Sequence, residues 1–268
     1  MILVKISAFG LLWLILSLAW VVPCSALDLG ISPPEISIQI DPGQTYQGEI
    51  FVFGSDRETT NVTIYKNDWF LTTAGAYQFL PVGTVKRSAS PWVSLNASQL
   101  SLPPKAGQKV QYTLRVPGNA AGSYWTALMF GTVPATSQGK DRLQIAMAGR
   151  VACIMRIDVN GSARSVGSIE RFNLNWDQQR HGLAAVMRVK NGGASFVHFQ
   201  GRLEIRDAQG RIVNVIPFGE GTVLPESAQE FRLQDESSGL KPGFYVALAI
   251  ADLGDKTMKA VQTTFQVK

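Results

Sequence analysis

The chain has 268 residues, of which 46% are hydrophobic and 17% charged, and its formal net charge is +5. This composition is too apolar and too weakly charged for a disordered chain, and the length suits one large domain or two of about 120 residues. Two cysteines exclude a disulfide framework or a Cys-rich zinc site, and two histidines leave little for histidine-based metal or triad chemistry. The sequence contains no basic cluster of the kind that nucleic-acid binding requires. We therefore expect no metal site, no cofactor and no nucleic-acid partner.

The chain begins with the features of a secretory signal. Lys5 precedes an uncharged run of 17 residues, Ile6 to Val22, which is shorter than the roughly 20 residues that span a bilayer. Small residues follow, so we expect a secretory signal that is cleaved after Ala26. An uncleaved membrane anchor and a lipoprotein signal lipidated at Cys24 are the two alternatives. The mature chain would keep Cys153 as its one cysteine, which excludes an intramolecular disulfide.

The rest of the chain is predicted to form strands. Short apolar or alternating runs, rich in Val, Ile, Thr, Tyr and Phe, recur between turn signals such as Asp41-Pro42-Gly43 and Asn191-Gly192-Gly193. The expected strands are 36–40, 46–53, 61–69, 110–116, 124–133, 143–159, 183–190, 196–206, 212–218, 229–233, 244–251 and 258–267. A single immunoglobulin-like (Ig-like) sandwich has about seven to nine strands, and the number of expected strands is larger. The predicted fold is therefore all-β, with two Ig-like β-sandwich domains in tandem.

The predicted boundary between the domains lies near residues 160–165. The longest expected strand ends there, and the sequence Asn-Gly-Ser-Ala-Arg-Ser has the composition of a polar linker. We expect a signal peptide at 1–26, an N-terminal Ig-like domain at 27–161 and a C-terminal Ig-like domain at 162–268.

The known motifs of catalytic sites are missing from the sequence. There is no Gly-x-Ser-x-Gly elbow, no phosphate-binding Gly-rich loop and no His-Glu-x-x-His pair. Ser-x-x-Lys occurs at 137–140 and 238–241, but in Gly-bearing loops without the motifs that accompany it in serine acylases. His181 and His198 are expected to be solvated. We therefore expect no catalytic residues and a protein that is not an enzyme.

One pair of segments is more specific. The segment Gly122–Pro134 leads through a polar loop, Ala135–Arg142, to a strand that begins Leu143-Gln-Ile-Ala and runs to Arg156. This pair resembles the last two strands of the first domain of PapD-like periplasmic pilus-assembly chaperones. The opening segment Ile31–Pro34, followed by Pro42-Gly43 and a second strand, is also similar to that family.

The resemblance implies two Ig-like sandwiches that bind secreted or pilin-like subunits lacking one strand, with an outer-membrane usher as a further candidate partner. Such a chaperone lends its last first-domain strand to the subunit, a form of β-strand addition. Alternate side chains of that strand fill the subunit's open groove, and Leu143, Ile145 and Met147 hold the matching positions. The same alternation continues to Ile157, so the whole face is equally well explained as core. A bulge at Gly149 would let the first half face a partner and the second half face inward.

The resemblance departs from the family at its anchor. Family members hold the subunit's terminal carboxylate with an Arg on the first strand and a Lys on the last. In this chain the first basic residue after the signal is Arg57, and the Lys position falls on Ala152. Arg150 and Arg156 share the expected strand face of Ala152. Arg150 is the candidate replacement and a predicted partner-binding residue, but its Arg partner is missing.

Two functions from different classes follow. The first is a periplasmic chaperone-like protein that binds subunits along its 143–147 edge strand, and it predicts that this edge is accessible. The second is an Ig-like structural or adhesive module at the cell surface, which predicts that the same residues are buried.

Overall fold

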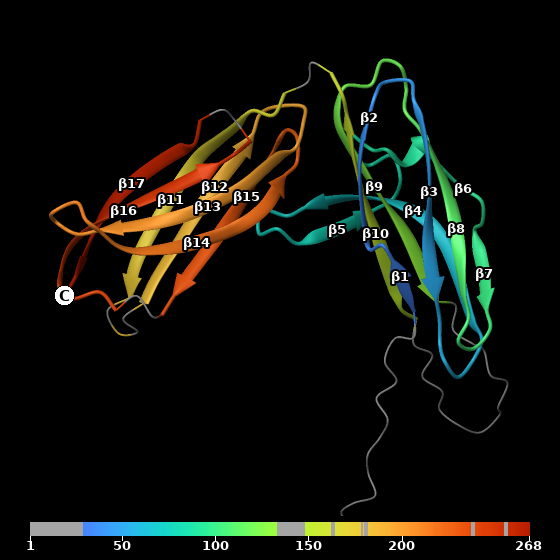
Figure 1. Ribbon diagram of the computed structural model, residues 1–268, viewed down its shortest axis with the longest axis horizontal. Coiled ribbons are helices and arrows are strands. Elements are labelled where there is room, and N and C mark those ends of the chain that lie inside the picture. Colours follow the sequence, from blue (N-terminus) through green and yellow to red (C-terminus); the bar gives the residue numbers. More distant parts are fainter. Residues whose placement is uncertain are drawn as a thin grey trace, which may run out of the picture.

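The computed structural model describes residues 29–132, 148–161, 164–177, 179, 182–236, 239–254 and 257–268. These residues fold almost entirely into strands, with one short 3-10 helix, η1 (Ser90–Trp92). Two β-sandwiches follow one another along the chain (Figure 1). The expected all-β fold with two sandwiches in tandem is confirmed. The predicted signal peptide and the predicted donor residues Leu143, Ile145 and Met147 lie outside the described residues.

The N-terminal sandwich consists of two sheets. One has the strand order β1-β3-β8-β6, and the other has the order β2-β10-β9-β4-β5, with β7 paired to the start of β4. Its strands are β1 (Gly30–Ser32), β2 (Glu35–Ile40), β3 (Thr45–Phe53), β4 (Thr60–Leu71), β5 (Tyr77–Leu80), β6 (Val93–Leu95), β7 (Gln99–Leu102), β8 (Gly107–Arg115), β9 (Gly122–Thr132) and β10 (Arg150–Val159).

The C-terminal sandwich also has two sheets, with the orders β11-β12-β15 and β14-β13-β16-β17. Its strands are β11 (Gly167–Asp177), β12 (Gly182–Asn191), β13 (Val197–Arg206), β14 (Ile212–Val223), β15 (Ser227–Asp235), β16 (Gly243–Asp252) and β17 (Lys259–Val267). Sheet membership changes between Val159 and Gly167. The predicted domain boundary lies in that connection and stays a prediction.

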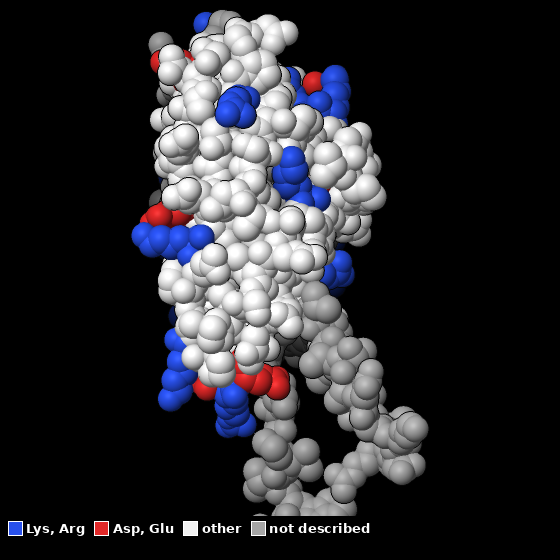
Figure 2. Space-filling view, turned by 90° about the vertical axis from the view of Figure 1, so that its right-hand side faces the viewer, with Lys and Arg blue, Asp and Glu red and all other residues white. Residues whose placement is uncertain are grey.

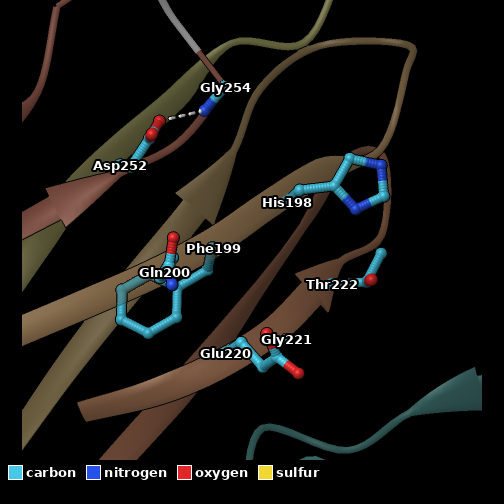
Figure 3. A pocket seen from close by; sticks show the side chains of 8 residues that line it. All are labelled: His198, Phe199, Gln200, Glu220, Gly221, Thr222, Asp252 and Gly254. Carbon is cyan, nitrogen blue, oxygen red and sulfur yellow. Dashed lines mark hydrogen bonds between the residues drawn. The ribbon is translucent and has the colours of Figure 1, made fainter. Parts of the chain in front are cut away.

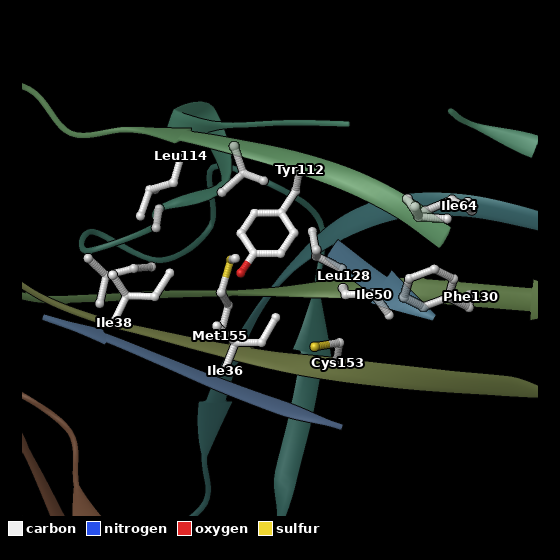
Figure 4. Close-up of a cluster of buried hydrophobic side chains, with 14 of the residues drawn as sticks. Ile36, Ile38, Ile50, Ile64, Tyr112, Leu114, Leu128, Phe130, Cys153 and Met155 are labelled. Carbon is white, nitrogen blue, oxygen red and sulfur yellow. The ribbon is translucent and has the colours of Figure 1, made fainter. Parts of the chain in front are cut away.

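The core of the N-terminal sandwich lies between its two sheets. In β2 the side chains of Ile36, Ile38 and Ile40 are buried and the residues between them are exposed, as period-2 alternation requires. They belong to one apolar cluster with Leu128 and Phe130 of β9 (Figure 4). Because each fully buried side chain of this kind contributes roughly 1.5–3 kcal/mol, packing can hold the sandwich without a disulfide.

A second cluster fills the C-terminal sandwich. Phe199 of β13 stacks on Phe231 of β15, with ring centroids 3.7 Å apart, and so joins the two sheets across the core. Leu203 and Ile205 continue the inward-facing row of β13 and are fully buried. Each sandwich therefore has its own core.

Strand β11 is the clearest element that the sequence pattern did not predict. Exposed Glu170 and Arg171 stand side by side, and a register shift against β12 between Ile169 and Arg171 breaks the two-residue period. The strand lies at the edge of its sheet, where polar residues are tolerated. Strands β5, β6 and β7 were also missed, because runs of three or four residues are too short to display a period.

The surface carries its charges in a dispersed way. On the side of the molecule that Figure 2 shows, Lys and Arg side chains stand singly or beside acidic ones. An ion pair between exposed side chains, Lys109 with Glu49, joins β8 to β3 at 2.6 Å. Within the described part of the chain, no helix has the length and hydropathy needed to cross a membrane.

The packing predicts a strong position dependence of apolar truncation. Phe130→Ala removes a fully buried ring and should lower the free energy of unfolding by about 3–5 kcal/mol. Val213→Ala, at a position that is 47% exposed, should change it by less than about 0.5 kcal/mol. Urea unfolding followed by tryptophan fluorescence measures both. Equal losses in the two variants would contradict the assignment of the core.

Candidate functional site

Strand β10 is paired along its whole length on one side and along half its length on the other. It runs antiparallel to β9 from Arg150 to Val159. On its other side it runs parallel to β2, but that pairing begins at Ile154, opposite Glu35. Among the described residues, no strand pairs with the second edge of Arg150–Cys153. This half-paired stretch is called the open edge.

The hydrogen-bond pattern determines which backbone groups face the open edge. The N–H of Ile154 donates to Pro34 O at 2.9 Å on the β2 side, and Gly149 O accepts from Thr132 N at 2.9 Å on the β9 side. Because backbone groups alternate along a strand, the N–H and C=O of even-numbered residues point toward β2 and those of odd-numbered residues toward β9. The N–H and C=O of Ala152 therefore face the open edge.

Two prolines end the pairing between β2 and β10. In a parallel ladder, the residue that accepts from the N–H of Ile154 also donates its own N–H to the carbonyl of Ala152. That residue is Pro34, which has no N–H. Ahead of Pro33 the chain belongs to β1, which pairs with β3 in the opposite sheet. The open edge is thus a consequence of where the chain changes sheets.

The two faces of β10 have different surroundings. Cys153, Met155 and Ile157 are fully buried in the core of the N-terminal sandwich. Ala152 and Ile154, on the opposite face, pack against a separate apolar cluster. The interpretation of the odd-numbered face of the predicted strand as core is therefore confirmed for the residues of that strand that the structure describes. The register with β9 runs from Arg150 to Val159 without a shift, so no bulge interrupts it there.

The cluster on the even-numbered face lies between the two sandwiches. Trp69 of β4 and Trp125 of β9 come from the N-terminal sandwich, and Phe196 and Leu224 come from the C-terminal half of the chain. Ring centroids are 6.0 Å apart between Trp69 and Trp125 and 5.7 Å apart between Trp125 and Phe196. The indole N–H of Trp125 donates to Trp69 O at 2.6 Å, so its polar atom is satisfied.

Backbone hydrogen bonds join the halves around this cluster. The N–H of Ser123 donates to Ala194 O at 2.9 Å, and the N–H of Phe196 donates to Ser123 Oγ at 2.8 Å. At the tip of the β4–β5 hairpin, Thr73 O accepts from the N–H of Glu230 in β15 at 2.7 Å. Apolar packing and these hydrogen bonds together hold the N-terminal sandwich, which includes β10, against the second sandwich.

The two arginines of β10 have different roles. Arg150 is exposed at the start of the strand. Arg156 is enclosed: it forms an ion pair with Glu35, donates to the Tyr77 hydroxyl at 2.7 Å and lies 5.6 Å from the Trp69 ring centre. Burial lowers the pKa of the Arg156 guanidinium from its usual value. The sequence marked the cation but not its partner, because Glu35 lies 121 positions earlier and meets it only through the parallel register of β2.

Cys153 is a buried free thiol. Its side chain lies in the core, with Sγ 3.4 Å from Pro33 O. Burial raises the pKa of Cys153 to about 12. At pH 8 the folded protein should hold on the order of 1,000-fold less thiolate than the unfolded chain. Its reaction with Ellman's reagent should accordingly wait for unfolding, and a rapid reaction of the folded protein would contradict this burial.

A shallow hollow of about 390 Å³ lies on the C-terminal sandwich, lined by His198, Gln200, Glu220, Thr222 and Asp252 among others (Figure 3). The carboxylate of Asp252 accepts from Gly254 N at 2.9 Å. In the described part of the chain, no group of three His, Cys, Asp or Glu side chains is placed to hold a metal ion. Because its polar residues stand on strands of an outer sheet face, the hollow is a solvated surface feature.

Comparison with known proteins finds similarity among solved structures alone. No family model matches the chain, and no curated protein matches it. Among solved structures, it is similar to the class 5 fimbriae chaperone CfaA, at 11% identity and a TM-score of 0.48, with 88% of this chain and 98% of that chain covered. It is also similar to the CsuC–CsuE chaperone–tip adhesion subunit complex of the archaic chaperone-usher Csu pili of Acinetobacter baumannii, at 11% identity and a TM-score of 0.43, with 87% and 97% covered.

The E. coli chaperone DraB is a third such structure, at 10% identity and a TM-score of 0.40, with 90% of this chain and 99% of that chain covered. These matches are with the class of protein that the segments around residues 122–156 resemble. At such identities and TM-scores they assign no partner and no residue role to this chain.

The hydrogen-bond pattern of β10 predicts unequal losses of stability from proline at neighbouring positions. Ala152→Pro removes an N–H that faces the open edge and should lower the free energy of unfolding by less than about 1 kcal/mol. Val151→Pro removes an N–H directed at β9 and should cost about 3 kcal/mol. Chemical unfolding of the two variants gives the comparison, and an equal cost would show that both edges of residues 151–152 are paired.

Proposed function

We propose that this protein is a periplasmic chaperone-like protein that binds secreted or pilin-like subunits by β-strand addition along the open edge of β10 and the segment preceding it. The observation that carries the proposal is the half-paired strand: β9 pairs with Arg150–Cys153, and β2 begins only opposite Ile154. An unpaired edge offers a row of backbone donors and acceptors to an extended chain. A subunit that lacks a strand has unpaired backbone groups of its own, with which such an edge can form hydrogen bonds.

The predicted donor residues extend this edge toward the N-terminus of the strand. Leu143, Ile145 and Met147 have the same parity as Cys153 and Met155, whose side chains fill the core of the N-terminal sandwich. In a strand that continued regularly, these three apolar side chains would form one row that could fill a groove in the subunit. Arg150, exposed on the opposite face, would meet polar or acidic groups at the rim.

The surroundings of β10 favour a binding edge that is already in place. Its odd-numbered face is anchored in the core and its even-numbered face is packed against the cluster between the sandwiches. A strand held on both faces loses little conformational freedom when a partner pairs with it, which preserves affinity. The proposal requires no catalytic residue and no cofactor, and it places the protein in the periplasm, with an outer-membrane usher as a candidate second partner.

One observation favours the second candidate, an Ig-like structural or adhesive module at the cell surface. Arg156, the enclosed cation of β10, is already engaged by Glu35 and Tyr77 within the same chain. Because this cation is used within the fold and is not available to a partner, it is consistent with a structural module that carries no subunit. The two candidates differ in whether a subunit is captured at all.

The test is capture by edge variants. Tagged wild-type, Ala152→Pro and Ala152→Thr proteins are expressed in the periplasm, and the co-purified proteins are identified by mass spectrometry. Pilin-like subunits should be recovered with the wild type and with Ala152→Thr, which keeps the outward N–H. Recovery with Ala152→Pro should fall by about tenfold, because the partner loses a backbone hydrogen bond and meets the proline ring.

A triple variant, Leu143→Thr, Ile145→Thr and Met147→Thr, tests the side-chain row separately. It should lose capture while keeping the stability of the folded domains. Unchanged recovery in both the proline and the threonine variants would exclude strand addition at this edge. Recovery of no subunit by the wild type would favour the structural or adhesive module.

A further inference from the structure

One strand of the C-terminal sandwich is apolar on both of its faces. In β16, Ala247, Ala249 and Ala251 are fully buried in the core. The residues that alternate with them point to the outside of the sheet and are also apolar: Phe244, Val246, Leu248 and Ile250. A continuous apolar run is the pattern of a strand that is covered on both faces. All four outward residues are nevertheless partly or largely exposed, and Phe244 is 68% exposed.

The two strands next to β16 complete a surface with one charged row between two apolar rows. The charged row belongs to β13 and lies directly opposite the outward residues of β16; it consists of Arg202, Glu204 and Arg206. The second apolar row belongs to β14 and lies on the other side of the charged row; it consists of Ile212, Val215 and Pro217. These three rows, with Phe244 at one end and the hollow at the other, are called the outer face.

Ion pairs hold the charged row together. Arg202 donates to the carboxylate of Glu204 at 3.1 Å, and Arg206 donates to the same carboxylate at 2.8 Å. The Glu204 side chain is 8% exposed, so one enclosed carboxylate holds two guanidinium groups in place. Beyond the row, Arg211 and Asp207 pair at 2.7 Å and cancel each other's charge. The row itself therefore carries an excess of one positive charge.

The opposite end of the outer face is acidic. Gln200 lies six positions before Arg206 on β13, and Glu220 of β14 and Asp252 of β16 flank it (Figure 3). Both of these carboxylates belong to residues that line the hollow. The charge of the outer face is thus positive toward Arg206 and negative toward the hollow.

The two ends also differ in shape. At the basic end, the exposed ring of Phe244 lies one outward position beyond Val246 on β16. At the acidic end lies the hollow of about 390 Å³, which is lined in part by His198, Thr222 and Gly254. The edge of an aromatic ring is weakly positive and is therefore compatible with neighbouring carboxylates. One end carries a ring, and the other a depression that can receive one.

We propose that the outer face binds the outer face of a second copy of this chain. A two-fold axis lies between the two sheets, perpendicular to the strands at Leu203, so that β13 of one copy runs antiparallel over β13 of the other. Arg202 of one copy then faces Glu204 of the other. Arg206 faces the end that carries Glu220 and Asp252. The ring of Phe244 faces the hollow, and each apolar row faces its own counterpart.

The charges oppose the other two-fold arrangement of the same faces. An axis parallel to the strands would lay β13 parallel to β13 of the second copy. Arg206 would then face Arg206, and Glu220 would face Asp252, so like charges would meet at both ends. The antiparallel arrangement brings opposite charges together at both ends and is favoured for that reason.

The outer face is small, so the dimer is weak. Three strands spaced about 4.8 Å apart, with about eight residues each at about 3.4 Å per residue, form a face of about 15 Å by about 27 Å. This area is below the about 800 Å² per partner of a standard stable interface. The dimer should therefore form reversibly as the protein concentration rises. Because the outer face does not include β10, the inference is independent of the proposed function.

Sedimentation equilibrium of the purified protein between about 5 µM and about 500 µM tests the inference, since this range covers the affinities expected of a weak interface. The average mass of the wild type should rise from that of the monomer toward twice that value. Phe244→Ala should weaken the dimer by about tenfold or more, because an aromatic anchor is lost. Glu220→Lys should weaken it by about fivefold, because the new cation would face Arg206.

Two matched variants are the controls. Phe53→Ala removes a ring that is 45% exposed on the N-terminal sandwich, and Glu58→Lys reverses an exposed charge between β3 and β4. Both should leave the dissociation constant unchanged, and circular dichroism should show that all four variants are folded. A dimer that Phe244→Ala and Glu220→Lys leave as strong as the wild type would use another surface, and would overturn the inference. A wild type that stays monomeric up to about 500 µM would overturn it as well.

Discussion

Residue 34 is a proline, so the carbonyl of Ala152 has no N–H opposite it in the position where β2 would otherwise continue. The rest of the proposed site depends on this constraint. The chain leaves one sheet at Ser32 and joins the other at Glu35, and the strand that it joins is left with an edge paired on one side at Arg150–Cys153. Proteins usually protect such edges, and the proposed function places a partner strand at this one, next to a well-packed core.

The interface between the sandwiches gives this edge its chemical character. Trp69, Trp125 and Phe196 form an aromatic row against the even-numbered face of β10. Trp69 of this row covers Arg156, which Glu35 neutralises from the neighbouring strand. Packing between the halves holds β10 in place, and Glu35, Tyr77 and Trp69 of the N-terminal sandwich enclose a cation that would otherwise attract anions. In the proposed function, the open edge recognises a partner through backbone groups and apolar side chains, which favours a broad choice of extended segments.

The sequence predicted most strands from period-2 alternation, as in Ile36, Ile38 and Ile40, or from an apolar run, as in β9. It missed β11, where Glu170 and Arg171 stand together at a register shift, and it missed strands too short to display a period. The burial of Cys153 followed from its place in an apolar row. The ion pair of Arg156 with Glu35 did not, because it depends on the register between strands that are distant in sequence. The donor role of Leu143, Ile145 and Met147 stays a prediction.

The most direct test of the account is amide hydrogen exchange along β10, measured by NMR in the free protein and in a complex with a captured subunit. In the free protein the amide of Ala152 should exchange rapidly, while those of Val151 and Ile154, which are directed at β9 and β2, should be protected. Addition of the subunit should slow the exchange of Ala152 strongly and change its neighbours little. An Ala152 amide as protected as Val151 and Ile154 in the free protein would mean that the edge is already paired, and would contradict the account.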